Sequence, residues 1–131
     1  MARLGTHYSG IMGAMEVYGR LIQEGFQVYI PIAYVGHDCI VKNRLGQHFN
    51  IEIKSREPGK TNFQLPTNMI GDKAGEKRNF VILHYYGTED SWVLPWEVAW
   101  AHRSNTNRII LGQKMKRELH PYKDAFHLIP G

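Results

Sequence analysis

The sequence predicts an α/β or α+β domain in which helices flank one central, mixed β-sheet. Three observations support this prediction. A segment with helical spacing opens the chain, strand-like runs follow it, and short helical and strand-like segments alternate in the second half. The 131 residues are 43% apolar and 21% charged, which is typical of one folded unit with its own core. We therefore expect residues 1–131 to form a single domain.

Residues 10–24 are predicted to form the first helix, and Gly25 is a natural stop. The early glycines lower the helix propensity, so packing must hold this segment in place. A strand is expected next, over residues 26–31. The apolar residues of the helix recur at helical spacing and are Ile11, Met15, Tyr18 and Ile22.

A β-hairpin is predicted where residues 37–41 and 49–56 flank a polar turn that contains Gly46. Side chains alternate along a strand, so Glu52 and Lys54 share one face while the isoleucines at 51 and 53 share the other. Asp38 lies near the start of the partner strand. Two carboxylates and one ammonium group are therefore expected to meet at the end of the hairpin.

The second half is expected to contain four short strands and two short helices. The long apolar run at 80–86 is typical of a buried strand, and Pro95 is suited to start a helix. A polar segment at 67–79 is expected to be a loop or a short helix. The strands are expected at 62–66, 80–86, 91–95 and 108–111, and the helices at 95–101 and 122–128.

The charge balance favours a polyanionic partner. The formal net charge is +4, and the basic residues are grouped at Arg103 with Arg108, at Lys73 with Lys77-Arg78, and at 114–117. Each group is also compatible with a solvated surface.

Several other classes of protein are not expected. Cys39 is the only cysteine, so no intrachain disulfide can form, and a cytoplasmic location is the default. No apolar run is long enough to cross a bilayer. The glycines at 71–75 lack the Lys-Ser pair of a P-loop, so we expect no nucleotide cofactor. The seven histidines show no zinc-site spacing, and His37 is of interest only as a proton shuttle beside Asp38.

The order of these features resembles the PD-(D/E)XK nuclease superfamily, which has a restriction-endonuclease-like fold. The residues that carry the resemblance are Glu16 on the first helix, residues 25–28, Asp38, and residues 51–56. Within the superfamily the pattern is most similar to archaeal Holliday-junction resolvases and group I intron-encoded homing endonucleases. The match covers about the first half of the chain. His37 stands where the family has a proline before its first aspartate.

The resemblance implies a metal-dependent phosphodiesterase site. Asp38 and Glu52 would bind Mg²⁺ or Mn²⁺ with the carbonyl of Ile53, since hard cations take oxygen ligands. Lys54 would orient the attacking water and offset charge in the transition state. Glu16 would complete the site through a bound water or through a hydrogen bond to Lys54.

Further residues are implied in substrate contact. Gln64 would reach the site or the scissile phosphate, and a surface glutamine is the competing interpretation. Ser55 and Arg56 would contact the nucleic-acid backbone, although Arg56 could instead be an exposed arginine. The other residues expected to bind nucleic acid are Lys60, Lys114, Lys116 and Arg117.

The resulting hypothesis is a Mg²⁺-dependent DNA endonuclease that acts on junctions or on specific duplex sites. Because a nuclease of this size must cut two strands, a homodimer or a dimer of dimers is expected. Two alternatives stay open at this point. One is a nucleic-acid-binding module that keeps the nuclease fold without turnover. The other is an interaction protein in which the hairpin charges are only surface.

Overall fold

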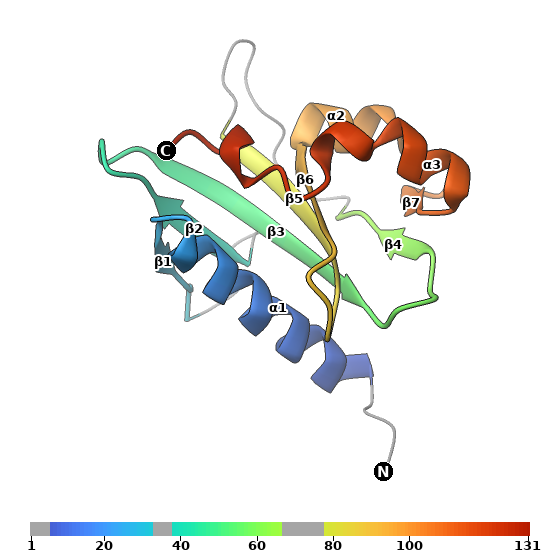
Figure 1. Ribbon diagram of the computed structural model, residues 1–131, viewed down its shortest axis with the longest axis horizontal. Helices are drawn as coiled ribbons and strands as arrows, with labels where there is room; N and C mark the ends of the chain where they lie inside the picture. The colour runs from blue at the N-terminus through green and yellow to red at the C-terminus, as the bar shows by residue number, and fades with distance from the viewer. Residues whose placement is uncertain (1–5, 33–37, 67–77) are drawn as a thin grey trace.

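The computed structural model describes residues 6–32, 38–66 and 78–131 and shows a five-stranded sheet with helices on both faces (Figure 1). The strand order is β1-β2-β3-β5-β6. The β3–β5 pair is parallel and the other pairs are antiparallel, so the sheet is mixed as predicted. The strands of this sheet are β1 (Gln27–Tyr29), β2 (Cys39–Lys42), β3 (His48–Arg56), β5 (Asn79–Tyr85) and β6 (Ser91–Pro95).

The predicted hairpin is present as β2 and β3, with Cys39 opposite Ile51 and Lys42 opposite His48. Its turn is fixed by Asn43, whose side-chain oxygen accepts hydrogen bonds from the N–H groups of Leu45 and Gln47. Gly46 adopts φ +81°, a conformation that favours glycine. The turn therefore sets the register that brings the start of β2 next to the middle of β3.

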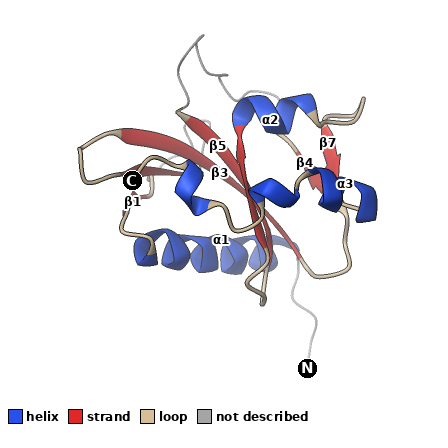
Figure 2. Ribbon diagram, turned by 45° about the horizontal axis from the view of Figure 1, so that its top comes forward, coloured by secondary structure: helices blue, strands red, loops and turns tan. Residues whose placement is uncertain are grey.

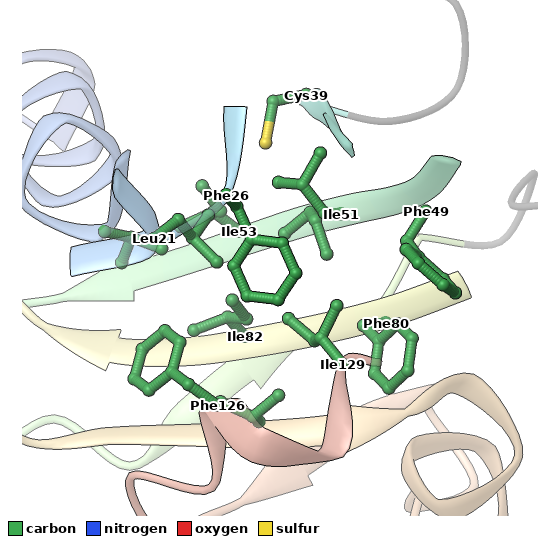
Figure 3. Close-up of a cluster of buried hydrophobic side chains, with 13 residues drawn as sticks. Leu21, Phe26, Cys39, Phe49, Ile51, Ile53, Phe80, Ile82, Phe126 and Ile129 are labelled. Atoms are coloured by element: carbon green, nitrogen blue, oxygen red, sulfur yellow. The ribbon is translucent and has the colours of Figure 1, made fainter. Parts of the chain in front are cut away.

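One face of the sheet is covered by α1 (Thr6–Gln23), which lies across β3 (Figure 2). Val17 and Leu21 of this helix are fully buried, and the C-terminal segment adds Phe126 and Ile129 to the same core. Figure 3 shows how these side chains meet those of the sheet. The strand residues of this core are Cys39, Val41, Phe49, Ile51, Ile53, Phe80, Ile82 and Val93.

The opposite face is covered by α2 (Trp96–Ala101), α3 (Gln113–Glu118) and a separate two-stranded sheet. That small sheet consists of β4 (Asn62–Gln64) and β7 (Arg108–Ile110), and we call it the β4–β7 ribbon. Its inward residues, Phe63 and Ile109, are buried against the main sheet. One apolar cluster thus includes residues of β3 and β5 on the α1 face, and the other includes residues of β5 and β6 on the opposite face.

Three expectations for the second half need correction. The predicted strands at 62–66 and 108–111 form the ribbon rather than joining the central sheet. Helix α3 was not predicted, because it has six residues and buries none of them. The predicted helix at 122–128 is instead two 3₁₀ turns, His120–Tyr122 and Phe126–Leu128, separated by Asp124 with φ +51°.

Other expectations fall outside the residues that the structure describes, namely the loop at 67–77, with Lys73 and Lys77, and His37. Among the helices that are described, none combines the length and the apolar character needed to cross a membrane.

Helix α1 approaches β3 most closely at Gly13. A Cβ atom at this position would overlap both side-chain atoms of Ser55. Gly10 and Gly19 of the same helix have nothing within 4 Å of such an atom. Glycine at position 13 is therefore required by packing, whereas Gly19 only lowers helix propensity.

We expect Gly13→Ala to lower the free energy of unfolding by about 1–3 kcal/mol, the usual cost of overpacking a core. Gly19→Ala is the matched control and should raise it by roughly 0.5–1 kcal/mol through helix propensity. Chemical denaturation of both variants measures the difference. Equal stabilisation by the two alanines would contradict the close approach of α1 and β3.

Candidate active site

Asp38 and Glu52 lie on adjacent strands of the β2–β3 hairpin. Asp38 immediately precedes Cys39, the first residue of β2, and Cys39 pairs with Ile51 next to Glu52. The N–H of Asp38 donates to the Ile51 carbonyl at 2.9 Å, which holds Asp38 against β3 beside the residue that precedes Glu52. Both carboxyl groups lie close enough to Cys39 for their charges to raise its pKa. The hairpin thus brings two carboxyl-bearing residues side by side.

Asp38 also binds the main chain of β3. Its Oδ2 atom accepts a hydrogen bond from the N–H of Ile53 at 2.6 Å. In an extended strand the N–H and C=O of one residue point to the same side, so the Ile53 carbonyl faces the same strand edge. A pocket opens at this edge, and its lining residues are Asp38, Ile53 and, from α1, Gly10, Ile11, Ala14, Met15 and Tyr18.

Lys54 lies beside Glu52, with 3.4 Å between Nζ and Oε1. The Glu52 side chain is 5% exposed, whereas that of Lys54 is 29% exposed. Burying a carboxylate without a partner is costly, and the ammonium group offsets that cost. Lys54 therefore connects the buried Glu52 carboxylate to the solvent-facing surface.

Two neighbouring side chains respond to the negative charge of this site. Burial, followed by the charges of Cys39, Asp38 and Glu52 in that order, raises the pKa of Tyr18 to about 12. Burial, followed by the charges of Asp38 and then Glu52, raises the pKa of Cys39 from 9.0 to about 12. Anions are disfavoured here and a cation is favoured.

The donor set fits a hard divalent cation. Carboxylate oxygens from Asp38 and Glu52 and a carbonyl oxygen from Ile53 are the ligands that Mg²⁺ accepts, with waters completing its shell. In the part of the chain that the structure describes, no three His, Cys, Asp or Glu side chains are grouped to hold a metal. A cation at this site would therefore rest on two carboxylates and a main-chain oxygen.

Glu16 is not where the sequence placed it. Its Oε1 lies 2.9 Å from Nε2 of His84, and the N–H of Gly87 donates to both carboxylate oxygens at 2.8 and 3.0 Å. These contacts replace the predicted hydrogen bond to Lys54. Position 16 lies about 200° around the helix from positions 14 and 18, which line the Asp38 pocket. Glu16 thus links α1 to β5 and to the turn that follows β5 through hydrogen bonds.

Ser55 and Gln64 also depart from their predicted roles. The Ser55 hydroxyl is buried next to Gly13, so it does not face a surface where nucleic acid could bind. Gln64 is exposed, and its Oε1 accepts a hydrogen bond from Nε of Arg108 at 2.9 Å. Its Nε2 donates to the Asn107 carbonyl at 3.1 Å. The structure therefore assigns Gln64 to the β4–β7 ribbon.

Three of the predicted basic residues, Arg56, Lys60 and Lys116, lie near Tyr85, which pairs with Arg56 at the end of β3. Arg56 follows Lys54 on the same strand face and donates to the Asn62 carbonyl at 2.7 Å. The Tyr85 hydroxyl donates to the Lys60 carbonyl at 2.6 Å, and Nζ of Lys116 lies 5.6 Å from the Tyr85 ring centre. The exposed basic residues of α3 are Lys114, Lys116 and Arg117. A run of positive charge thus extends from Lys54 toward the ribbon.

Two residues of this region were missed by the sequence analysis. Tyr18 was assigned only to the apolar stripe of the helix, yet it lines the Asp38 pocket. Tyr85 is buried, and its ring centre lies 5.6 Å from Nζ of Lys116. The i, i+4 spacing of Ala14 and Tyr18 was the available signal, because it places both on one helix face.

Comparison with solved structures identifies a protein of similar fold, the bacterial homing endonuclease I-Ssp6803I. The TM-score is 0.70 and the sequence identity is 18%, and the alignment covers 97% of this chain and 92% of that one. No protein-family model and no curated protein matches the sequence. The structural match shows that the chain has a homing-endonuclease-like fold.

We expect the Cys39 thiol to resist labelling in the native protein. With a pKa near 12 it carries almost no thiolate at pH 8, and the side chain is fully buried. Reaction with an aromatic disulfide reagent should be slow in buffer and immediate in guanidinium chloride. Fast, stoichiometric labelling of the native protein would contradict this environment.

We expect Glu16→Ala to lower stability rather than remove a reacting group. Losing the carboxylate leaves the buried His84 and the Gly87 N–H without that partner, at a cost of about 1–3 kcal/mol. Gln23→Ala, exposed on the same helix, is the matched control and should stay within about 0.5 kcal/mol of wild type. If Glu16→Ala has the same free energy of unfolding as wild type, the contacts of Glu16 with His84 and Gly87 do not stabilise the packing of α1.

Proposed function

We infer that this protein is a metal-dependent DNA endonuclease that hydrolyses phosphodiester bonds. The observation that carries the proposal is the grouping of Asp38, Glu52, Lys54 and the Ile53 carbonyl at one edge of β3, beside an open pocket. Two carboxylates, a carbonyl and an ammonium group meet the needs of phosphodiester hydrolysis.

Each residue has a chemical part in the proposed reaction. Asp38 and Glu52 would hold Mg²⁺ or Mn²⁺, which supplies Lewis acidity at the scissile phosphate. The hydrogen bond from Ile53 fixes the Asp38 carboxylate before substrate arrives, so little reorganisation is needed. Lys54 lies within reach of solvent and would orient the attacking water and stabilise the charge that develops on the phosphate.

The wider surface supports nucleic acid as the substrate. Arg56 and Lys60 lie where β3 leads into β4, and α3 exposes three further positive charges, so phosphate groups on either side of the scissile bond would find partners. The likeness in fold to a homing endonuclease favours cleavage of a specific duplex site over cleavage of a four-way junction.

The decisive experiment is cleavage of labelled duplex, four-way-junction and single-stranded DNA with Mg²⁺, Mn²⁺ or EDTA. Wild-type protein should cut only with metal, and Glu52→Gln should not cut. Lys54→Met should slow cleavage by about 10²–10⁴-fold, the usual contribution of a group that assists proton transfer. Glu97→Gln, exposed on α2, is the charge-matched control and should cut like wild type.

The outcomes separate the open alternatives. Metal-dependent cutting that Glu52→Gln abolishes supports the endonuclease. Tight, salt-sensitive binding of every DNA without cutting would instead identify a binding module that keeps only the fold. If the protein neither binds nor cuts any of these DNAs, the remaining alternative is an interaction protein whose hairpin charges are only surface. Calorimetric titration of Mg²⁺ or Mn²⁺ into wild type and Glu52→Gln tests the metal separately, and no uptake by the wild type would contradict the site.

A homodimer is proposed as the working form, because one site cuts one strand. Helix α1, the edge strand β1 and the segment after it expose apolar side chains that a second copy would cover, and they include Ile22, Tyr29, Ile30 and Ile32. Multi-angle light scattering should give twice the monomer mass for wild type, and Ile22→Asp should shift it toward monomer. Leu45→Asp, in the exposed β2–β3 turn, is the control and should leave the mass unchanged.

A further inference from the structure

The β4–β7 ribbon has a polar outer face that the proposed reaction does not use. Its strands have three residues each and alternate between exposed and buried positions. The register pairs Asn62 with Ile110 and Gln64 with Arg108, and these four side chains are exposed. Because Phe63 and Ile109 anchor the ribbon from below, its outer face is a rigid platform rather than a free loop.

Arg108 is held in a defined orientation on this face. Its Nε donates to Oε1 of Gln64 at 2.9 Å, and Nε2 of Gln64 donates in turn to the carbonyl of Asn107 at 3.1 Å. The described part of the chain offers no acceptor to the two terminal nitrogens of the guanidinium group. Arg108 thus presents an end-on fork of donors, which matches two adjacent acceptors on a ligand.

The turn that leads into β7 is equally ordered. Ser104 accepts hydrogen bonds through its hydroxyl from the N–H groups of Thr106 and Arg108, and its own N–H donates to the Arg108 carbonyl at 2.7 Å. Asn107 adopts φ +58°, a conformation that asparagine tolerates better than most residues. The position of Arg108 is therefore set from both the turn and the partner strand.

The ribbon is joined to the candidate active site and bordered by positive charge. Arg56, two residues beyond Lys54, donates to the Asn62 carbonyl and so ties β3 to the first residue of β4. Lys60 precedes β4, and α3 with its basic residues follows β7 directly (Figure 1). Glu57 and Glu118 are the acidic residues of these flanking segments.

We propose that the outer face of the β4–β7 ribbon reads DNA sequence in the major groove and that Arg108, positioned by Gln64, recognises a guanine. This inference rests on the proposed endonuclease function and adds its specificity element. A two-stranded ribbon fits the width of the major groove, and an arginine fork pairs with O6 and N7 of guanine. The basic residues beside the ribbon hold the phosphates of both strands and fix the depth of insertion.

The test selects preferred sequences from a random duplex library with full-length protein that carries Glu52→Gln to prevent cutting. The parent protein should enrich a motif that contains guanine, with a preference at that position of about 5- to 160-fold. Arg108→Ala and Arg108→Lys should both reduce this preference to near unity. Arg108→Lys keeps the charge and loses the fork, so its salt dependence should match that of the parent.

Two further variants complete the design. Gln64→Ala should weaken the guanine preference while leaving the thermal midpoint and the affinity for unrelated DNA unchanged, as expected of a positioning residue. Arg117→Ala on α3 is the charge-matched control; it should lower affinity for all sequences and reduce the salt slope by about one, while keeping the motif.

The possible failures are distinct. An unchanged motif in both Arg108 variants, or a parent protein that binds DNA with no enriched motif, overturns the ribbon assignment and leaves the endonuclease in place. A uniform loss of affinity with a reduced salt slope in Arg108→Ala would make Arg108 a phosphate contact and would also overturn it. Absence of DNA binding by the parent protein overturns the endonuclease and this inference together.

Discussion

The pairing of Glu52 with Lys54 is the contact on which the centre of this molecule depends. Strand β3 is packed on both faces, so a carboxylate at its middle is withdrawn from water. An isolated charge in such a place costs several kcal/mol or forces the group to take up a proton. The ammonium group two residues along the same face removes that penalty and lets an acid exist at the heart of the sheet.

The register of the β2–β3 hairpin is a second constraint on the arrangement of the acidic residues. Once β3 is fixed by the apolar cluster under α1, the turn at Asn43 to Gln47 sets its pairing with β2, which places Cys39 opposite Ile51 and Asp38 directly before it. A slip of one residue would turn Asp38 to the other face and break its hydrogen bond to Ile53. The same turn chemistry therefore holds both the sheet and the arrangement of the acidic residues.

The sequence allowed the first half of the fold to be predicted because its signals are local. The alternation along 49–56 and the glycine-containing turn determined the hairpin, and they placed Glu52 and Lys54 on one face of its second strand. Glu16 was predicted to face the site because the sequence shows which residues share a helix face, but only the packing of the helix shows which face lies against the site. The structure shows that the face of Ala14 and Tyr18, rather than that of Glu16, lines the pocket.

The second half was harder to predict because its strands are very short and their partners are distant. Three-residue segments such as β4 and β7 carry little periodicity, so their assignment to a separate ribbon depended on tertiary packing. The roles of Ser55 and Gln64 were missed for the same reason. The glycine at 13 that covers Ser55 and the arginine at 108 that binds Gln64 lie far from them in sequence.

These differences in sequence separation also imply an order of assembly. The β2–β3 hairpin closes a short loop, whereas Asn50 must find Asn79, 29 residues away, and Gln64 must find Arg108, 44 residues away. Short loops close faster and at lower entropic cost than long ones. During folding the acidic residues would therefore meet early, and the ribbon would form only after β5, β6 and α2 had been added to the sheet.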